Sequence, residues 1–227
     1  MRRPNYRNPR YAGAVRRQEE MAAQVRLSPL PADIRFVAGA DVSFFLYGST
    51  FWGGMVVCDL EDGLRPVESA VVRMEVTFPY IPGLLGFREV PVLTAAFERL
   101  KIRPDVLLVD AHGIAHPRYL GSASHLGVAL GTPSVGCAKS RLCGEHEEPG
   151  NNRGRWSPLV VEGETRGAVL RTRSSVKPVF VSPGHLCNLR SAVELVLKCA
   201  PRYRIPEPIR RAHDLTNSAR RSSVASG

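Results

Sequence analysis

The sequence lacks the features of membrane, secreted and disulfide-stabilised proteins. No apolar run approaches the roughly 20 residues that cross a bilayer, and the basic N-terminus is not followed by the apolar stretch of a signal peptide. The 5 cysteines are an odd number and form no Cys-x-x-Cys pair, which excludes a disulfide scaffold and a thiolate zinc cage. We therefore expect a globular protein of the reducing cytoplasm with no membrane partner.

Lysine is also scarce, so arginine carries the positive charge. Lys and Arg total 31, of which 4 are lysine, against 21 acidic residues, and the net charge is +10. Residues 1–35 carry a net charge of +5 and residues 201–227 one of +4, so the stretch between them is nearly neutral. Two basic ends suit a polyanionic partner, because arginine displaces counterions from phosphate; basic tails are also often simply solvated.

The 227 residues are enough for one packed α/β domain. No repeat or break in composition marks a second domain. We expect a disordered basic N-terminal tail over residues 1–14, a single domain over residues 15–218 and a disordered C-terminal tail over residues 219–227.

Apolar periodicity predicts a three-stranded antiparallel meander followed by alternating helices and strands. The meander strands are expected over residues 36–45, 50–60 and 67–76, because short connections force antiparallel neighbours. The other strands are expected over residues 106–109, 134–138, 159–162, 168–171 and 179–181. Helices are expected over residues 15–25, 92–100, 119–130, 185–199 and 206–218. This order favours one mixed sheet flanked by helices.

Two aspartates interrupt these apolar strands. Even positions of strand 36–45 are all apolar, whereas Asp41 lies among small residues on the other face, where an ionised carboxylate loses solvation unless it is compensated. Asp110 ends the apolar run 106–109. A crossover through helix 92–100 would make the two carboxylates neighbours, and such a pair suits magnesium or manganese. Either aspartate alone is more often a hydrogen-bond acceptor.

Three more polar residues can complete such a site, although each also has an ordinary structural explanation. Glu89 precedes Pro91 near the start of a predicted helix, where acids are favoured. Lys139 follows a strand and can offset charge on a phosphate, or it is simply solvated. A lone late histidine such as His213 is usually structural.

The pair His112 and His116 has the spacing of a zinc-binding helix. Gly113 and Pro117 disfavour a regular helix there, and no cysteine pattern supports zinc. We treat zinc as the weaker interpretation.

The segment 78–83, Phe-Pro-Tyr-Ile-Pro-Gly, is the most unusual local signal. Two prolines bracket Tyr80 and Ile81 and stiffen the tip. One interpretation is a rigid turn with an apolar residue tucked inward. The other is a wedge, since aromatic or apolar residues on stiff loops can enter and unstack base steps.

Taken in order, these motifs closely resemble the endonuclease V family, which implies a ribonuclease H-like α/β fold. The matching segments span about residues 37–216 and read GADVSF (39–44), FPYIPG (78–83), FRE (87–89), LLVDAHG (107–113), HPR (116–118), GCAKS (136–140), WSPL (156–159), VSPGH (181–185) and IPEPIRRAH (205–213). Any one of them is weak evidence. Their shared order and spacing make a chance resemblance improbable.

The resemblance implies roles for five residues of a catalytic centre. Two of them, Asp41 and Asp110, bind the divalent metal. Glu89 and His213 complete the centre, and Lys139 lies near the scissile phosphate.

The resemblance also implies two groups of substrate-contacting residues. Tyr80 is the tip of the wedge that fills the space left by the rotated base, and the DNA-contacting segment is Pro79, Tyr80, Ile81 and Pro82. The pocket for the everted base is expected at Gly83, Leu85, Gly113 and Leu142.

The activity implied is a Mg²⁺-dependent DNA repair endonuclease, with Mn²⁺ as a substitute. Its substrate is double- or single-stranded DNA containing deoxyinosine, cut at the second phosphodiester bond 3′ to the lesion to leave 3′-hydroxyl and 5′-phosphate ends. The alternatives are an endoribonuclease for inosine-containing RNA and a binding module without catalysis. Two features go beyond the family motifs: the arginine-rich N-terminal extension, and Asp214, which can share the role of the neighbouring His213.

Overall fold

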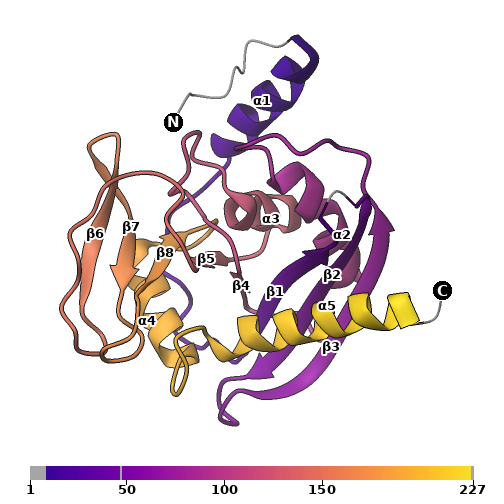
Figure 1. The fold of residues 1–227 in the computed structure, drawn as a ribbon. Helices are drawn as coiled ribbons and strands as arrows, with labels where there is room; N and C mark the ends of the chain where they lie inside the picture. Colours follow the sequence, from indigo (N-terminus) through magenta and orange to yellow (C-terminus); the bar gives the residue numbers. More distant parts are fainter. Residues whose placement is uncertain (1–8, 47, 226–227) are drawn as a thin grey trace.

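An eight-stranded mixed sheet runs through the structure, a computed structural model that describes residues 9–46 and 48–225 (Figure 1). The order across the sheet is β3-β2-β1-β4-β5-β8-β7-β6. The strands are β1 (Phe36–Phe44), β2 (Thr50–Asp59), β3 (Arg65–Glu75), β4 (Val106–Val109), β5 (Ser134–Ala138), β6 (Trp156–Val161), β7 (Glu164–Leu170) and β8 (Val179–Pro183). The β1–β3 meander is antiparallel, β4 and β5 run parallel to β1, and β8, β7 and β6 are again antiparallel. The predicted fold class is confirmed.

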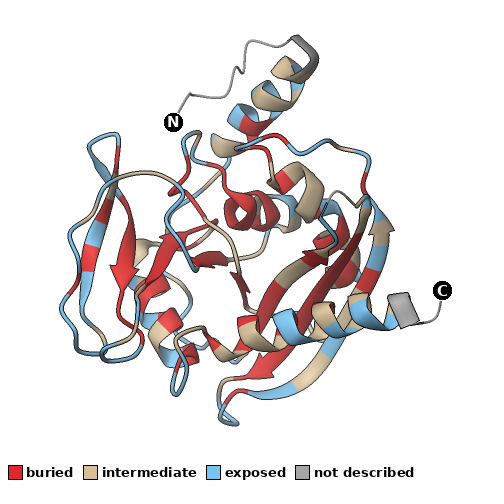
Figure 2. Ribbon diagram, in the orientation of Figure 1, coloured by how far each residue is buried: buried red, intermediate tan, exposed pale blue. Residues whose placement is uncertain are grey.

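Helices cover both faces of this sheet and enclose two apolar cores. The helices are α1 (Pro9–Ala22), α2 (Gly86–Glu98), α3 (Ser122–Leu130), α4 (Leu189–Cys199) and α5 (Glu207–Ala225). One core lies between the sheet and the pair α2 and α3, and the other lies between the opposite face and the pair α4 and α5. Figure 2 shows the central strands as mainly buried, which is how hydrophobic burial stabilises a sheet covered on two sides.

The helix α5 lies unusually close to the meander because two glycines face it. A Cβ atom added at Gly39 would lie 1.9 Å from the carbonyl oxygen of Pro208, and one added at Gly54 would lie 2.6 Å from Cγ2 of Thr216. Gly54 is the cross-strand partner of Asp41. The close approach therefore brings the side chains of α5 next to that carboxylate.

The C-terminal end is more ordered than the sequence predicts. The helix α5 includes residues 219–225, a segment for which the sequence predicts a disordered tail. The guanidinium of Arg220 lies 4.8 Å from the ring centroid of Phe45, and its Nη2 donates a hydrogen bond to Asn217 Oδ1 at 3.1 Å. The contact with Phe45 ties the end of the helix to the loop after β1. Residues 226 and 227 lie outside the described part of the chain.

At the N-terminus, helix α1 begins at Pro9, inside the tail expected over residues 1–14. Residues 9–14 form the first turns of this helix, because a helix anchored at one end propagates through adjacent turns at little cost. The anchor is the buried pair Gln18 and Met21. Residues 1–8 lie outside the described part. Within the residues that the structure describes, no helix is both long and apolar enough to span a bilayer.

Candidate metal centre and adjoining cavity

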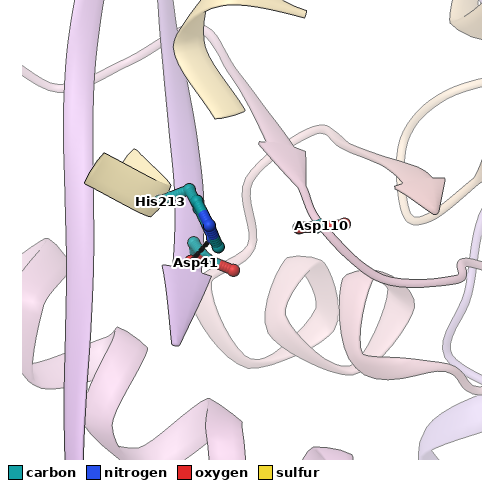
Figure 3. Close-up of side chains that lie close together, drawn as sticks. All are labelled: Asp41, Asp110 and His213. Carbon is teal, nitrogen blue, oxygen red and sulfur yellow. Dashed lines mark hydrogen bonds and ion pairs between the residues drawn. The ribbon is translucent and has the colours of Figure 1, made fainter. Parts of the chain in front are cut away.

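Three ligand-bearing side chains meet at the C-terminal ends of β1 and β4. Asp41 on β1, Asp110 immediately after β4 and His213 on α5 each offer one ligand atom within 4.8 Å of the others (Figure 3). The parallel pairing of Ala40 with Val109 places the two aspartates side by side. The predicted juxtaposition of Asp41 and Asp110 is confirmed.

One oxygen of Asp41 is held by two residues of α5. Its Oδ2 accepts hydrogen bonds from Nδ1 of His213 at 3.0 Å and from Oγ1 of Thr216 at 3.1 Å. Thr216 is fully buried. Because these donors all approach Oδ2, the other oxygen, Oδ1, accepts none of the hydrogen bonds found among the described residues.

The electrostatics of the two aspartates favour a bound cation. Burial raises the pKa of Asp41, the negative charge of Asp110 raises it further, and His213 lowers it. The two aspartate side chains are only 11% and 12% exposed, so water screens their repulsion poorly. Carboxylate oxygens at this spacing are the ligands that a hard divalent cation takes. The donor set therefore fits the divalent metal.

Lys139 and Glu89 approach the same centre from other elements. Lys139, directly after β5, forms an ion pair between its Nζ and Oδ2 of Asp110. Glu89 lies in the first turn of α2, where burial raises its pKa to about 7; a hydrogen bond with Ser122 opposes this shift, and the charges of Asp41 and Asp110 add to it. All five predicted catalytic residues are thus brought together.

A cavity of about 430 Å³ adjoins the carboxylates. Its wall includes five residues predicted to contact the substrate, namely Tyr80, Pro82, Gly83, Leu85 and Leu142, together with Glu89, Asp110 and Lys139. The predicted pocket residue Gly113 is not among the residues that line it. Gly113 is buried and packs tightly against β8, since a Cβ atom there would be 1.9 Å from the carbonyl oxygen of Pro183. Its backbone nitrogen donates to Ser182 Oγ at 2.7 Å.

The segment 78–83 presents its aromatic residue at the rim of this cavity. Tyr80 is 66% exposed, and Pro79 and Pro82 are also exposed. Ile81, expected among the DNA contacts, is buried and supports the tip from beneath. The guanidinium of Arg88 lies 6.0 Å from the Tyr80 ring centroid and 4.7 Å from that of Phe51, so it connects the tip to the core.

Several lining residues were not predicted as pocket residues. His112, His116, Ser122, Ser140 and Arg141 line the cavity. The Nε2 atom of His112 donates to the carbonyl oxygen of Ser140 at 2.9 Å, which links two loops of the wall. Burial lowers the pKa of His116 to about 3.

Three other candidate residues, His112, His116 and Asp214, do not belong to the metal-ligand group. His112 and His116 belong to a stretch without regular helix, and the aspartate and histidine group above is the only potential metal cluster among the described residues. Asp214 lies 3.7 Å from Arg210 in an ion pair and lines a different surface hollow. Thr216 was not predicted as a site residue from the sequence. Its i, i+3 spacing from His213 indicates that the two side chains lie on the same face of the helix, and this spacing could have identified it.

Comparison with known proteins shows similarity over most of the chain. The sequence model of the endonuclease V family matches residues 19–214. The endonuclease V of Myxococcus xanthus is 49% identical over 210 residues, which are 92% of this chain and 89% of that protein. The crystal structure of the endonuclease V of Streptomyces avermitilis has a TM-score of 0.89 and 41% identity, covering 96% of this chain and 95% of the other.

A third similar structure contains nucleic acid. It is the Ciona intestinalis endonuclease V in complex with a 24mer DNA containing an inosine followed by a ribo-adenosine. Its TM-score is 0.82 and its identity 26%, covering 95% of this chain and 99% of the other.

Proposed function

This chain belongs to the endonuclease V family of nucleases, and from that premise we propose that it repairs DNA by cutting beside deoxyinosine. The observation that carries the proposal is the direct contact between the carboxylate centre and the cavity: Asp110, Glu89 and Lys139 belong to both. A base held in the cavity therefore lies beside the groups that cut. The DNA containing inosine bound by the Ciona protein supports this choice of substrate.

Recognition requires the lesion to leave the base stack. Tyr80, held at the rim by two prolines, is placed to fill the vacated space, and the cavity volume of about 430 Å³ lies in the range of small-molecule sites. Unstacking costs a few kcal/mol, and it costs least where pairing is already weak. Hypoxanthine opposite a mismatched base meets that condition.

Cleavage is proposed at the second phosphodiester bond 3′ to the lesion. Water attacks phosphorus and the bond to the 3′ oxygen breaks, which leaves a 3′-hydroxyl and a 5′-phosphate. A divalent cation, Mg²⁺ with Mn²⁺ as substitute, supplies polarisation of the phosphate and a more acidic water.

The side chains of the centre have distinct parts in this step. Asp41 and Asp110 hold the cation, and His213 with Thr216 fixes the orientation of Asp41 through Oδ2. Lys139 offsets negative charge on the phosphate. Glu89 lines the cavity beside Asp110 and would hold water next to the cation.

The direct test uses an end-labelled duplex with one deoxyinosine, incubated with Mg²⁺ and with EDTA. The expected result is a single nick 3′ of the lesion, absent with EDTA, with an adenine control duplex and with the Asp110→Ala variant. Asp214→Asn serves as the matched control, because Asp214 lies outside the centre, and it should cut like the wild type. A duplex cut equally well by Asp110→Ala would contradict the assignment.

Inosine-containing RNA is the second candidate substrate. The ribo-adenosine next to inosine in the Ciona complex favours testing it. The same assay with an inosine-containing RNA strand separates the two substrates by their relative kcat/KM. If neither substrate is cut in Mg²⁺ or Mn²⁺ but the lesion is bound, the protein is a binding module.

A further inference from the structure

A glutamine on the N-terminal helix is buried against two loops of the cavity. Gln18 on α1 is 2% exposed, although most residues around it are polar and accessible. Its Nε2 donates to the carbonyl oxygens of Gly83 and Leu120, both at 2.9 Å. Its Oε1 accepts a hydrogen bond from Nε of Arg118. The amide therefore has partners for both of its polar atoms.

Arg118 adds a second connection to the same point. Its Nη2 donates to the carbonyl oxygen of Gly83 at 2.8 Å. The Gly83 carbonyl thus receives hydrogen bonds from two side chains that also bond to each other. Three segments that are distant in sequence, namely α1, the tip 78–83 and the loop 111–121, meet in one network.

The network acts on the backbone that shapes the cavity. Gly83 and Leu120 both line the cavity, and Gly83 has a φ of +79°, a conformation that glycine adopts most readily. Hydrogen bonds are directional, whereas apolar contacts are not. A buried amide that bonds two loop carbonyls therefore fixes the position of one loop relative to the other.

We propose that Gln18 is a positioning residue for the lesion cavity. It holds the Gly83 carbonyl against the Leu120 carbonyl and so sets the position of Tyr80 relative to the cavity wall. Gln18 acts through Gly83 and touches no substrate atom. It lies just before residues 19–214, which the family model matches. The proposal rests on the proposed function, since it assigns Gln18 to recognition of the base.

The decisive variant is Gln18→Glu. The glutamate keeps a side-chain oxygen that accepts the hydrogen bond from Arg118. It loses the N–H groups that donate to the carbonyl oxygens of Gly83 and Leu120. Gln18→Leu removes all three hydrogen bonds at similar size. The matched control is Gln24→Leu, because Gln24 is exposed just beyond α1 and its side chain donates only to the carbonyl of Glu20.

Two readouts separate positioning from general stability. The first is steady-state cleavage. Loss of the buried hydrogen bonds displaces the cavity wall, so KM for the lesion duplex should rise about tenfold while kcat changes less than about twofold. The second is the fluorescence of 2-aminopurine placed next to deoxyinosine, measured at saturating protein in an Asp110→Asn background. Its increase on unstacking should be smaller in both Gln18 variants and unchanged in Gln24→Leu.

A variant of the partner residue keeps the proposal testable if Gln18→Leu folds poorly. Arg118→Gln should raise KM in the same direction, and its effect should be less than additive with that of Gln18→Glu, because both act on the Gly83 carbonyl. Melting temperatures of all variants are measured in parallel. Wild-type KM and wild-type fluorescence in Gln18→Glu would overturn the proposal, whatever its melting temperature.

Failure of this proposal differs from failure of the proposed function. If the wild-type protein neither cuts nor unstacks the lesion duplex, the function itself is wrong. If the wild type does both and the Gln18 variants match it, only the positioning role is wrong.

Discussion

The two sides of the site are built on different principles. The catalytic side consists of ionisable side chains, Asp41, Asp110 and His213, placed by strand pairing and by the tight docking of α5. The cavity side consists largely of loop backbone, held by hydrogen bonds from Gln18 and Arg118. The first side controls charge and the second controls shape.

This difference predicts separable effects on the kinetic constants. Changes on the catalytic side should lower kcat, because they alter groups that act on the phosphate. Changes on the cavity side should raise KM for the lesion, because they alter only the fit of the base.

Asp110→Asn should have the largest effect, on kcat. The amide removes one negative ligand from the centre and the partner of Lys139, and metal catalysis is worth several kcal/mol, roughly a thousandfold in rate. Single-turnover nicking measures the loss, and lesion binding should persist. Equal losses of lesion binding and of cleavage would show that the catalytic side and the cavity side do not act independently.

Gly39→Ala should destabilise the protein by about 3 kcal/mol, because the added methyl group collides with the backbone of α5. Urea unfolding measures the change in free energy. The control Gly13→Ala has nothing within 4 Å of the new Cβ and lies in the helix α1, so it should be neutral or stabilise by about 0.5–1 kcal/mol. Similar stabilities for both variants would show that α5 does not dock as described.

Acid should lower the stability of the protein through two buried histidines. Burial lowers the pKa of His125 to about 4, with the charge of Arg17 adding to the shift, and lowers that of His116 to about 3, with Arg118 and His112 adding. Between pH 6.5 and pH 4 the unfolded chain binds protons at these residues and the folded chain does not. Stability should therefore fall as the pH falls through this window, by about 2 kcal/mol for His125 alone.

The variant His125→Gln isolates that contribution. His125 packs edge-on against Phe87 at 4.9 Å between ring centroids, so the substitution also removes a packing contribution that does not depend on pH. The readout is the slope of the unfolding free energy between pH 6.5 and pH 4, which should be shallower in the variant. An unchanged slope would show that His125 titrates normally.

Tyr80→Ala should have the smallest effect, confined to lesion binding. A base stacked on an aromatic ring is worth about 1–3 kcal/mol, so affinity for the deoxyinosine duplex should fall about tenfold without a change in metal dependence. Tyr203→Ala is the matched control. Tyr203 is also exposed, and the guanidinium of Arg210 lies 4.5 Å from its ring centroid. Unchanged lesion affinity in Tyr80→Ala would remove the wedge from the mechanism.

The sequence predicts the catalytic side better than the cavity side. The alternation of residues along 36–44 and the crossover to strand 106–109 were enough to place Asp41 beside Asp110. Side chains alternate between the two faces of a strand, and strand pairing fixes which residues are neighbours. The alternation of apolar and polar residues in the sequence therefore predicts where each side chain lies.

The cavity side is formed largely by loops, whose sequences show no such alternation. Gly113 matched the family motif but does not line the cavity. Gln18 gave no sequence signal, because its partners are the carbonyl groups of Gly83 and Leu120 and the side chain of Arg118, all at least 65 residues away. The end of α5 was missed for the same reason: Arg220 is held by Phe45, a contact between distant segments that no local propensity contains.

The docking of α5 also has a consequence for how the protein is made. Asp41 leaves the ribosome early, whereas His213, its hydrogen-bond partner, follows 172 residues later. The same late helix supplies Ile209 and Ala212 to one of the two cores. A nascent chain therefore carries an incomplete cleavage centre until His213 has been synthesised, and a chain terminated before residue 207 never acquires one.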